Sequence, residues 1–371
     1  MQIQIGDTIL TKENIRDILV QAPDIHVDLE ITGIRGPFDG KINSIFQVET
    51  SNYGDLLIRC RTSKAFRYEP FIKEKVLYPI LDGTLDPFSP KCSSQIKTIV
   101  ENPRGSYAFS SSPAVPVQDL LFWDETLEML PFPYAIKRMV PGRSLYEIMQ
   151  EVPEEDLESD IFCDVFRQAG EMLGKLHAIR FPSFFETIDQ IGSASALAWP
   201  DLYWRQCQKQ LAEAKTHANI RPLLPKINKV LREGKELVTQ ETPVLFHNDY
   251  QAQNLIVQGD PREGLQLVGL IDFDNWRIGP AVQDFVKMFY WTIRGRAPLV
   301  DLFLQGYSAT QNLPDNFRNL LQIYQLLWFC LVFNFETDKI KKAELNAAVD
   351  SRFPAAEEYL SAIRSLLAEI S

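Results

Sequence analysis

Cysteine is scarce in this sequence, and the few cysteines are far apart. Five occur among 371 residues, and no pair has C-x-x-C or metal-ligand spacing. An odd and scattered set predicts reduced thiols rather than a disulfide framework or a cysteine-rich metal site. This absence excludes a disulfide-stapled fold and leads us to expect a cytoplasmic protein.

Long hydrophobic runs are also missing. The N-terminus has no cationic start followed by an apolar run, so no secretory signal is expected. The most apolar stretch, 320–335, is interrupted by Gln322, Gln325 and Asn334. This composition predicts a buried helix rather than a membrane span.

Positive charge is in deficit. The chain has 38 Lys and Arg residues against 49 Asp and Glu residues, a net charge of −11. Such a balance argues against general binding to nucleic-acid phosphates or to anionic membranes. Apolar residues make up 45% of the chain, and its length suits roughly two domains with sizeable cores.

The order of the expected elements predicts an α+β chain with two lobes. Alternating or β-branched runs between turn residues predict strands at 31–36, 42–50, 55–60, 120–123 and 134–140. A helix is expected at 68–81, and a loop at 83–117 with one short strand near 96–100. Helical spacing then predicts helices at 162–176, 202–214, 227–238, 282–293, 316–335 and 354–370, interrupted by strands at 244–246, 255–257 and 265–271. We expect an N-terminal lobe at 1–136, a hinge at 137–143 and a helical C-terminal lobe at 144–371.

The short β segment in the second half holds the polar residues that most need an explanation. Asp249 and Asn254 lie five positions apart between two apolar strands, and Asp272 and Asp274 follow the next strand. Mg²⁺ prefers a few carboxylate or amide oxygens plus water, and it neutralises the phosphates of a nucleotide during phosphoryl transfer. Asn254 and Asp272 are suitable ligands if their strands pair. Asp249 would then accept the proton of an acceptor hydroxyl, with His247 bracing the loop.

Each of these residues alone is more often structural, because a single acid at a strand end usually forms a turn or a helix cap. The joint pattern H-x-D-x-x-x-x-N, a hairpin and then I-D-F-D is far more specific. It resembles the aminoglycoside phosphotransferase and choline kinase-like family, which has a bilobal protein-kinase-like fold. The segment 279–285 resembles that family's G-x-P-x-x-D-L motif, which implies that Asp284 is structural and braces the loop after the metal site. Segments 134–145 and 170–177 resemble its hinge and its "LH" helix, in which His177 packs.

The same resemblance implies a nucleotide site in the first lobe. The loop 36–48 lacks G-x-G-x-x-G, and its backbone near Lys41, Asn43 and Ser44 is expected to cradle phosphates. Arg59 occupies the position of the family's phosphate-binding lysine, and its acidic partner is either Glu74 or Glu69. The base of the nucleotide, ATP or GTP, is expected against the backbone from Lys137 to Met139. Mg²⁺ is the implied cofactor, with Asp274 as a further metal-site acid.

The acceptor is less defined. A small alcohol such as an aminoglycoside-like antibiotic, an amino sugar or a choline-like metabolite is expected near Asp249. Candidate walls are Asn275, Trp276, Tyr203 and Trp204, although aromatic residues at helical spacing are often core residues. No nucleic acid or membrane partner is expected.

Three other classes of protein are alternatives to this small-molecule kinase. A protein kinase is disfavoured because no A-P-E segment follows the metal acid. A nucleotide-binding member with little or no catalysis stays open, because Arg59 replaces lysine and Asn248, Gln251 and Gln253 alter the catalytic loop. A metal-dependent hydrolase using the same acids, with water in place of the alcohol, is the least favoured.

Overall fold

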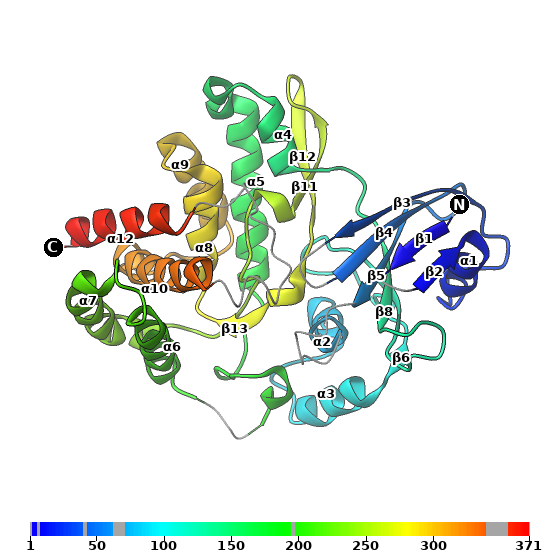
Figure 1. The fold of residues 1–371 in the computed structure, drawn as a ribbon, viewed down its shortest axis with the longest axis horizontal. Coiled ribbons are helices and arrows are strands. Elements are labelled where there is room, and N and C mark those ends of the chain that lie inside the picture. The colour runs from blue at the N-terminus through cyan, green and yellow to red at the C-terminus, as the bar shows by residue number, and fades with distance from the viewer. Residues whose placement is uncertain are drawn as a thin grey trace. The chain divides into compact units, whose positions relative to one another are not determined.

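The computed structural model describes residues 2–5, 8–39, 43–61, 71–193, 197–338 and 355–370, and the chain forms two compact units. Unit 1 consists of Met1–Glu154 and Gln253–Asp274. Unit 2 consists of Glu155–Ala252 and Asn275–Ser371. The first unit is rich in antiparallel strands and the second is mainly helical, as the predicted α+β class requires (Figure 1).

Unit 1 is organised around a six-stranded antiparallel sheet in the order β3-β4-β5-β8-β7-β6 (Figure 1). These strands are β3 (Ile31–Asp39), β4 (Asn43–Thr50), β5 (Leu56–Arg61), β6 (Arg104–Gly105), β7 (Leu120–Asp124) and β8 (Tyr134–Arg138). An N-terminal hairpin and helix precede the sheet, namely β1 (Gln2–Ile5), β2 (Thr8–Thr11) and α1 (Lys12–Leu19). Their apolar residues join one core with those of β4, β5 and β8. Helices α2 (Ile72–Leu81) and α3 (Cys92–Glu101) follow β5 in the chain.

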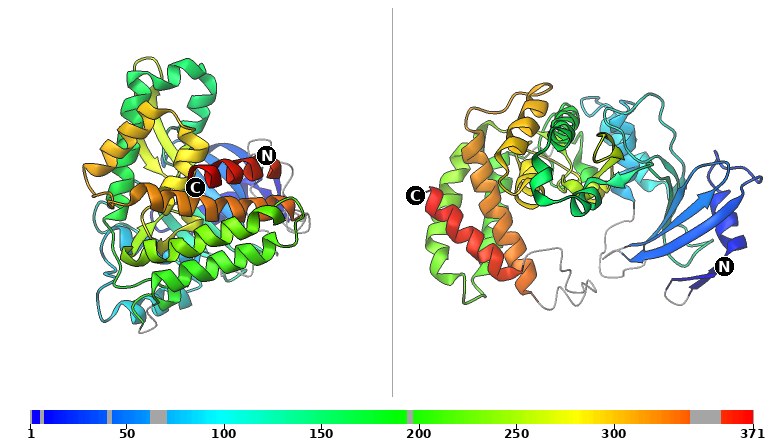
Figure 2. Two further views of the ribbon diagram at one scale, coloured as in Figure 1. Left: turned by 90° about the vertical axis from the view of Figure 1, so that its left-hand side faces the viewer. Right: turned by 90° about the horizontal axis from the view of Figure 1, so that it is seen from above.

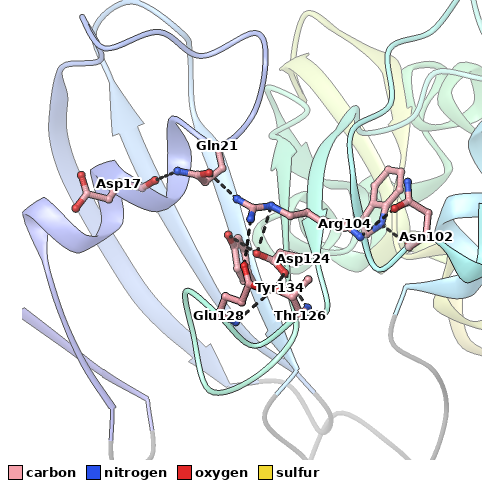
Figure 3. Close-up of polar contacts among 9 residues, drawn as sticks. Asp17, Gln21, Asn102, Arg104, Asp124, Thr126, Glu128 and Tyr134 are labelled. Carbon is pink, nitrogen blue, oxygen red and sulfur yellow. Dashed lines mark hydrogen bonds and ion pairs between the residues drawn. The ribbon is translucent and has the colours of Figure 1, made fainter.

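Arg104 ties the N-terminal segment to this sheet (Figure 3). Its guanidinium donates to Gln21 just beyond α1 at 2.6 Å and lies 3.7 Å from the buried Asp124 carboxylate on β7. Tyr134 on β8 donates to the same carboxylate at 3.4 Å. Because a buried charge is costly unless it is paired, these contacts hold α1 and the sheet edge in one arrangement.

A second, smaller sheet in unit 1 carries the predicted metal-site hairpin. Strand β11 (Leu255–Asp260) pairs with β12 (Gly264–Leu270) on one side and with β9 (Arg143–Ser144) on the other. Helix α4 (Leu145–Glu151) begins at Ser144, whose hydroxyl accepts from the Glu147 amide in a capping box. These contacts explain why unit 1 extends to Glu154 and includes the hairpin, whereas the sequence places a hinge at 137–143.

Unit 2 is mainly helical and contains a large apolar core. Its helices are α5 (Asp160–His177), α6 (Trp199–Ala214), α7 (Leu224–Leu237), α8 (Gln283–Lys287), α9 (Ala297–Ser308), α10 (Phe317–Thr337) and α12 (Ala356–Ile370), and a two-stranded sheet joins β10 (Val244–Phe246) to β13 (Arg277–Gly279). A π-helix at Met288–Ile293 continues from α8, and short 3-10 turns lie at 154–158, 188–190, 221–223, 238–240, 252–254 and 273–275. Helices α6, α7, α10 and α12 lie side by side (Figure 2). Their apolar residues form this core.

Helix α10 is the one helix among the described residues that is long and apolar enough to cross a membrane. Half of its most apolar window is buried inside the protein, and it packs against α6, α7 and α12. Long apolar helices in protein cores have this same composition. These contacts match the buried helix that the sequence predicts at this position.

Several predicted elements differ from the structure. The strand predicted near 96–100 is wrong, because this segment is helix α3, which buries Cys92 and Ile96 one turn apart. Its β-branched residues suggested a strand, but packing against α2 determines the outcome. The strand predicted at 31–36 is too short, since β3 continues to Asp39. Helix α9 was not predicted. The five cysteines are all free.

Close packing of α5 against α9 gives the first testable prediction. A Cβ atom added at Gly306 would lie 1.9 Å from the carbonyl oxygen of Arg167, so the two backbones must separate. We expect Gly306→Ala to lower the free energy of unfolding by about 2 kcal/mol, because overpacking outweighs the better helix propensity of alanine. Urea-induced unfolding measures this, with the exposed Ser308→Ala on the same helix as the control. Equal midpoints for both variants would contradict the close approach.

Candidate active site

In unit 1, two cations and two acids form a buried cluster. Arg59 on β5 pairs with Ala135 on β8, and Lys137 lies two residues further along β8, so both side chains share one face of the sheet. Glu74 in the first turn of α2 meets both of them. Its Oε1 accepts from Nη1 of Arg59 at 2.8 Å and also from Nζ of Lys137. All three residues are buried.

Arg59 also donates to the carboxylate of Asp274. Burial by itself would lower the pKa of Arg59, but the charges of Glu74, Asp274 and Asp272 outweigh burial and raise that pKa. Burial would raise the pKa of Asp274, and the positive charges of Arg59 and Lys137 reverse this and lower it. The cluster is therefore composed of charged groups that neutralise one another.

The structure shows which acid contacts Arg59, a choice between Glu74 and Glu69 that the sequence left open. The structure pairs Arg59 with Glu74, while Glu69 lies outside the described residues. The second oxygen of Glu74, Oε2, is buried and has no hydrogen-bond partner among the described residues. Such a buried acceptor is costly to leave unsatisfied, so it is available to a further donor.

Lys137 differs most from its expected role. Its side chain reaches Glu74, whereas the sequence predicted only a backbone contact with the base of a nucleotide. In addition, the amides of Arg138 and Met139 donate to the carbonyls of Asp119 and Asp55. A base at this backbone would have to use other groups, so that part of the expectation stays a prediction.

The expected phosphate-cradling loop is only partly described. Lys41 lies outside the described residues, and Asn43 is the first residue of β4. Ser44 follows it and pairs with Cys60 on β5. The role of this backbone stays a prediction.

The predicted metal ligands Asn254 and Asp272 lie at the same end of one hairpin. Asn254 immediately precedes β11, and Asp272 comes two residues after β12. The two strands are antiparallel, and the amide of Ile271 donates to the carbonyl of Asn254 at 3.0 Å. Asp272 has a positive φ of 62°, which is uncommon for a residue with a side chain and typical of functional sites. An amide and a carboxylate oxygen fit Mg²⁺, which keeps several waters.

In unit 2, the segment that holds Asp249 is fastened to α8 by its backbone. The carboxylate of Asp284 accepts from the amides of His247 and Asn248, both at 2.7 Å. The same carboxylate lies 3.1 Å from Nε2 of His177, whose Nδ1 lies 3.1 Å from the hydroxyl of Tyr307. Asp284 thus braces the loop at 247–248, whereas the sequence placed its contact after the metal site.

Asp249 itself is held by two donors. Lys287, the last residue of α8, donates to its Oδ1 at 2.6 Å, and the side-chain amide of Gln251 donates to the same atom at 2.9 Å. The sequence missed Lys287. Its only signal was the spacing of three residues from Asp284, which places both side chains on one face of a helix.

Asn248, where the family pattern has glycine, adopts a φ of 63°. Glycine takes this left-handed conformation without a steric penalty, and asparagine tolerates it better than most residues. Its side chain donates to the carbonyl of Asn275 at 3.1 Å. The substitution therefore keeps the backbone conformation that glycine would provide.

The predicted acceptor residues have different environments. Tyr203 is fully buried in the core and donates to the carbonyl of Leu231 at 3.0 Å, which makes it a core residue and corrects its assignment as a pocket wall. Trp276 is also buried. Trp204 is half-buried beneath the Arg232 guanidinium, and Asn275 is exposed. Their contacts with an acceptor stay predictions.

Comparison with known proteins identifies the class of this chain. The model of a family described as phosphotransferase enzymes matches residues 107–319, which is more than half of the sequence. The chain belongs to this phosphotransferase family. A search of the curated proteins returns no match.

Solved structures of phosphotransferases share the fold over nearly the whole length. APH(2")-IIia in complex with GDP and kanamycin is 14% identical with a TM-score of 0.57, covering 97% of this chain and 99% of its own. The ethanolamine kinase of Plasmodium vivax is 14% identical with a TM-score of 0.56, covering 98% and 93%. The macrolide 2'-phosphotransferase of Brachybacterium faecium is 14% identical with a TM-score of 0.54, covering 92% and 100%.

At such low identity, this likeness shows the fold alone, which is the kinase-like fold expected from the sequence. Membership of the phosphotransferase family makes the protein an enzyme that transfers a phosphoryl group.

Proposed function

We propose that this phosphotransferase moves the γ-phosphate of ATP or GTP to a hydroxyl group of a small, separate acceptor. The observation that carries the proposal is the fixed position of Asp249. Asp284 holds the backbone before it, and Lys287 and Gln251 hold its carboxylate. A carboxylate fixed in this way suits the orientation and deprotonation of an alcohol.

The cluster of unit 1 is the proposed binding site for the phosphates. The guanidinium of Arg59 can hold two phosphate oxygens, and Glu74 keeps it extended and charged. Arrival of a nucleotide would exchange the contact between Arg59 and Asp274 for one between Arg59 and phosphate. Asn254 and Asp272, together with Asp274 once it is released, would hold Mg²⁺, which would neutralise the phosphate charge when bound.

Other roles follow from the same proposal. His247 braces the loop that carries Asp249. The backbone near Lys41, Asn43 and Ser44 would contact phosphate, and the segment from Lys137 to Met139 would border the base. Asn275 and Trp204 remain candidates for the acceptor side. Cytoplasmic location remains an expectation from the scattered cysteines, and neither a nucleic acid nor a membrane is a proposed partner.

Membership of the phosphotransferase family argues against the hydrolase alternative. The non-catalytic alternative differs from our proposal only in turnover, so one experiment separates the two.

We expect ATP or GTP to stabilise the protein only when Mg²⁺ is present, because a ligand that binds the folded state raises its melting temperature. The measurement is a thermal shift with each nucleotide, with and without Mg²⁺. It is followed by an assay of ADP or GDP release with kanamycin, ethanolamine, choline and a macrolide as acceptors. If a nucleotide stabilises the protein but no ADP or GDP is released with any acceptor or with water alone, the non-catalytic alternative is favoured. No stabilisation by either nucleotide would contradict the proposal.

A further inference from the structure

Helix α8 presents two opposite charges to the segment 247–249. Asp284 and Lys287 are three residues apart and therefore lie on one face of this short helix. The acid accepts from the amides of His247 and Asn248, each at 2.7 Å. The ammonium of Lys287 donates to the carbonyl of Asn248 at 2.8 Å and to the carboxylate of Asp249 at 2.6 Å. The acid thus meets two amides of the loop and the ammonium meets a carbonyl and a carboxylate, while the Asp284 carboxylate also contacts Nε2 of His177 on α5 at 3.1 Å.

The ammonium of Lys287 is itself held in place. It lies 5.6 Å from the centre of the Trp291 ring, within range of a cation–π interaction. Trp291 in turn donates to the hydroxyl of Tyr359 on α12 at 3.2 Å. The Lys287 side chain is only 19% exposed and that of Asp249 17%. This differs from ordinary surface ion pairs, which are mobile and contribute little.

We infer that Lys287 is a positioning residue for phosphoryl transfer, acting through Asp249. This inference rests on the proposed function, in which Asp249 orients the acceptor hydroxyl. Asp284 holds the backbone of the loop through the amides of His247 and Asn248. Lys287 and Gln251 both donate to Oδ1 of Asp249, and Lys287 also donates to the carbonyl of Asn248, so it links the carboxylate to the backbone immediately before it. The orientation of the Asp249 carboxylate therefore depends in large part on Lys287.

The charge of Lys287 contributes in a second way. When the acceptor hydroxyl loses its proton, that proton passes to Asp249, the oxygen of the acceptor forms the new bond to the γ-phosphorus, and the bond from the γ-phosphorus to the β–γ bridging oxygen breaks, so that the nucleoside diphosphate leaves. The opposite charges of Lys287 and Asp249 attract each other, so the carboxylate stays oriented to accept a hydrogen bond from the hydroxyl. Neutral residues of similar length would keep the packing on Trp291 but lose both effects.

The test compares Lys287→Met with Lys287→Arg. We expect Lys287→Met to lower kcat about 50-fold at an unchanged KM for nucleotide, because misplacing a reacting group by about 1 Å can cost on the order of 100-fold. Lys287→Arg should recover kcat to within about fivefold, since a guanidinium can donate to both oxygens. The rate is nucleoside diphosphate release with the fastest acceptor among kanamycin, ethanolamine, choline and a macrolide, or with water if none is faster.

A merely structural role predicts a different set of results. Lys235 on α7 pairs with Asp201 at 2.9 Å on an exposed surface, so Lys235→Met is the matched control and should leave kcat unchanged. Hydrogen exchange of the His247 and Asn248 amides should stay slow in Lys287→Met, because Asp284 still accepts from them. Faster exchange together with a lower melting temperature and an equal loss in Lys287→Arg would overturn the inference.

Three further outcomes show how this inference and the proposed function can fail separately or together. Wild-type kcat in Lys287→Met, with Asp249→Asn inactive, would overturn the role of Lys287 and leave the proposed function standing. Wild-type kcat in Asp249→Asn would overturn the proposed function directly. A wild-type protein that releases no diphosphate with any acceptor or with water would overturn both.

Discussion

Asp249→Asn is expected to lower the rate of phosphoryl transfer by about 1,000-fold, because general-base catalysis typically contributes on the order of 100- to 10,000-fold. The asparagine amide has nearly the same size, but it cannot accept the proton of the acceptor hydroxyl. It also cannot form the ion pair with Lys287, whose Nζ lies 2.6 Å from Oδ1 of Asp249. Nucleotide affinity should change by less than about threefold, because the proposed phosphate ligands belong to unit 1.

The measurement combines steady-state release of the nucleoside diphosphate with equilibrium binding of the same nucleotide in the presence of Mg²⁺. Asp201→Asn is a suitable control, since it also removes an acid that pairs with a lysine, but on an exposed part of α6. A variant at position 249 that retains more than a tenth of the wild-type rate would remove Asp249 from the mechanism. Equal losses of rate and of nucleotide affinity would instead indicate a general disturbance of the fold.

Asp284→Ala is expected to lower the free energy of unfolding by about 3–5 kcal/mol, the range measured when one partner of a buried charged network is removed. The Asp284 side chain is completely buried. Its carboxylate serves the amides of His247 and Asn248 and the ring of His177. Alanine would leave these donors buried without an acceptor, which is more costly than the loss of a single exposed hydrogen bond.

The unfolding transition can be followed by circular dichroism in urea, with Asp301→Ala on α9 as the control because Asp301 is exposed. Activity at low temperature, where the variant is still folded, should fall as well, since the backbone before Asp249 loses its anchor. Asp284→Asn should be intermediate in stability, because it keeps one acceptor oxygen and adds a donor that faces other donors. A midpoint within experimental error of the wild type would contradict the network.

The residues of the proposed catalytic segment could be predicted because the pattern that identifies them lies within a short stretch of sequence. His247, Asp249 and Asn254 occur at fixed spacing between two short apolar strands, and the hairpin that follows brings Asp272 to the same end as Asn254. Turn residues and alternating hydrophobicity specify such a hairpin without reference to the rest of the chain. The same reasoning fails at α3, where the β-branched residues of a short segment suggest a strand and packing against α2 makes a helix.

The sequence by itself therefore determined the α+β class, the family resemblance and the identity of the acid and amide residues proposed for catalysis and metal binding. The tertiary structure decided which distant side chains meet them. Arg59 contacts Asp274, which is 215 positions away, and Lys137 and Arg59 share Glu74. Lys287 reaches Asp249 across 38 positions. Propensity and spacing act over a few residues, whereas ion pairs between distant segments depend on the packing of complete strands and helices, which no short pattern contains.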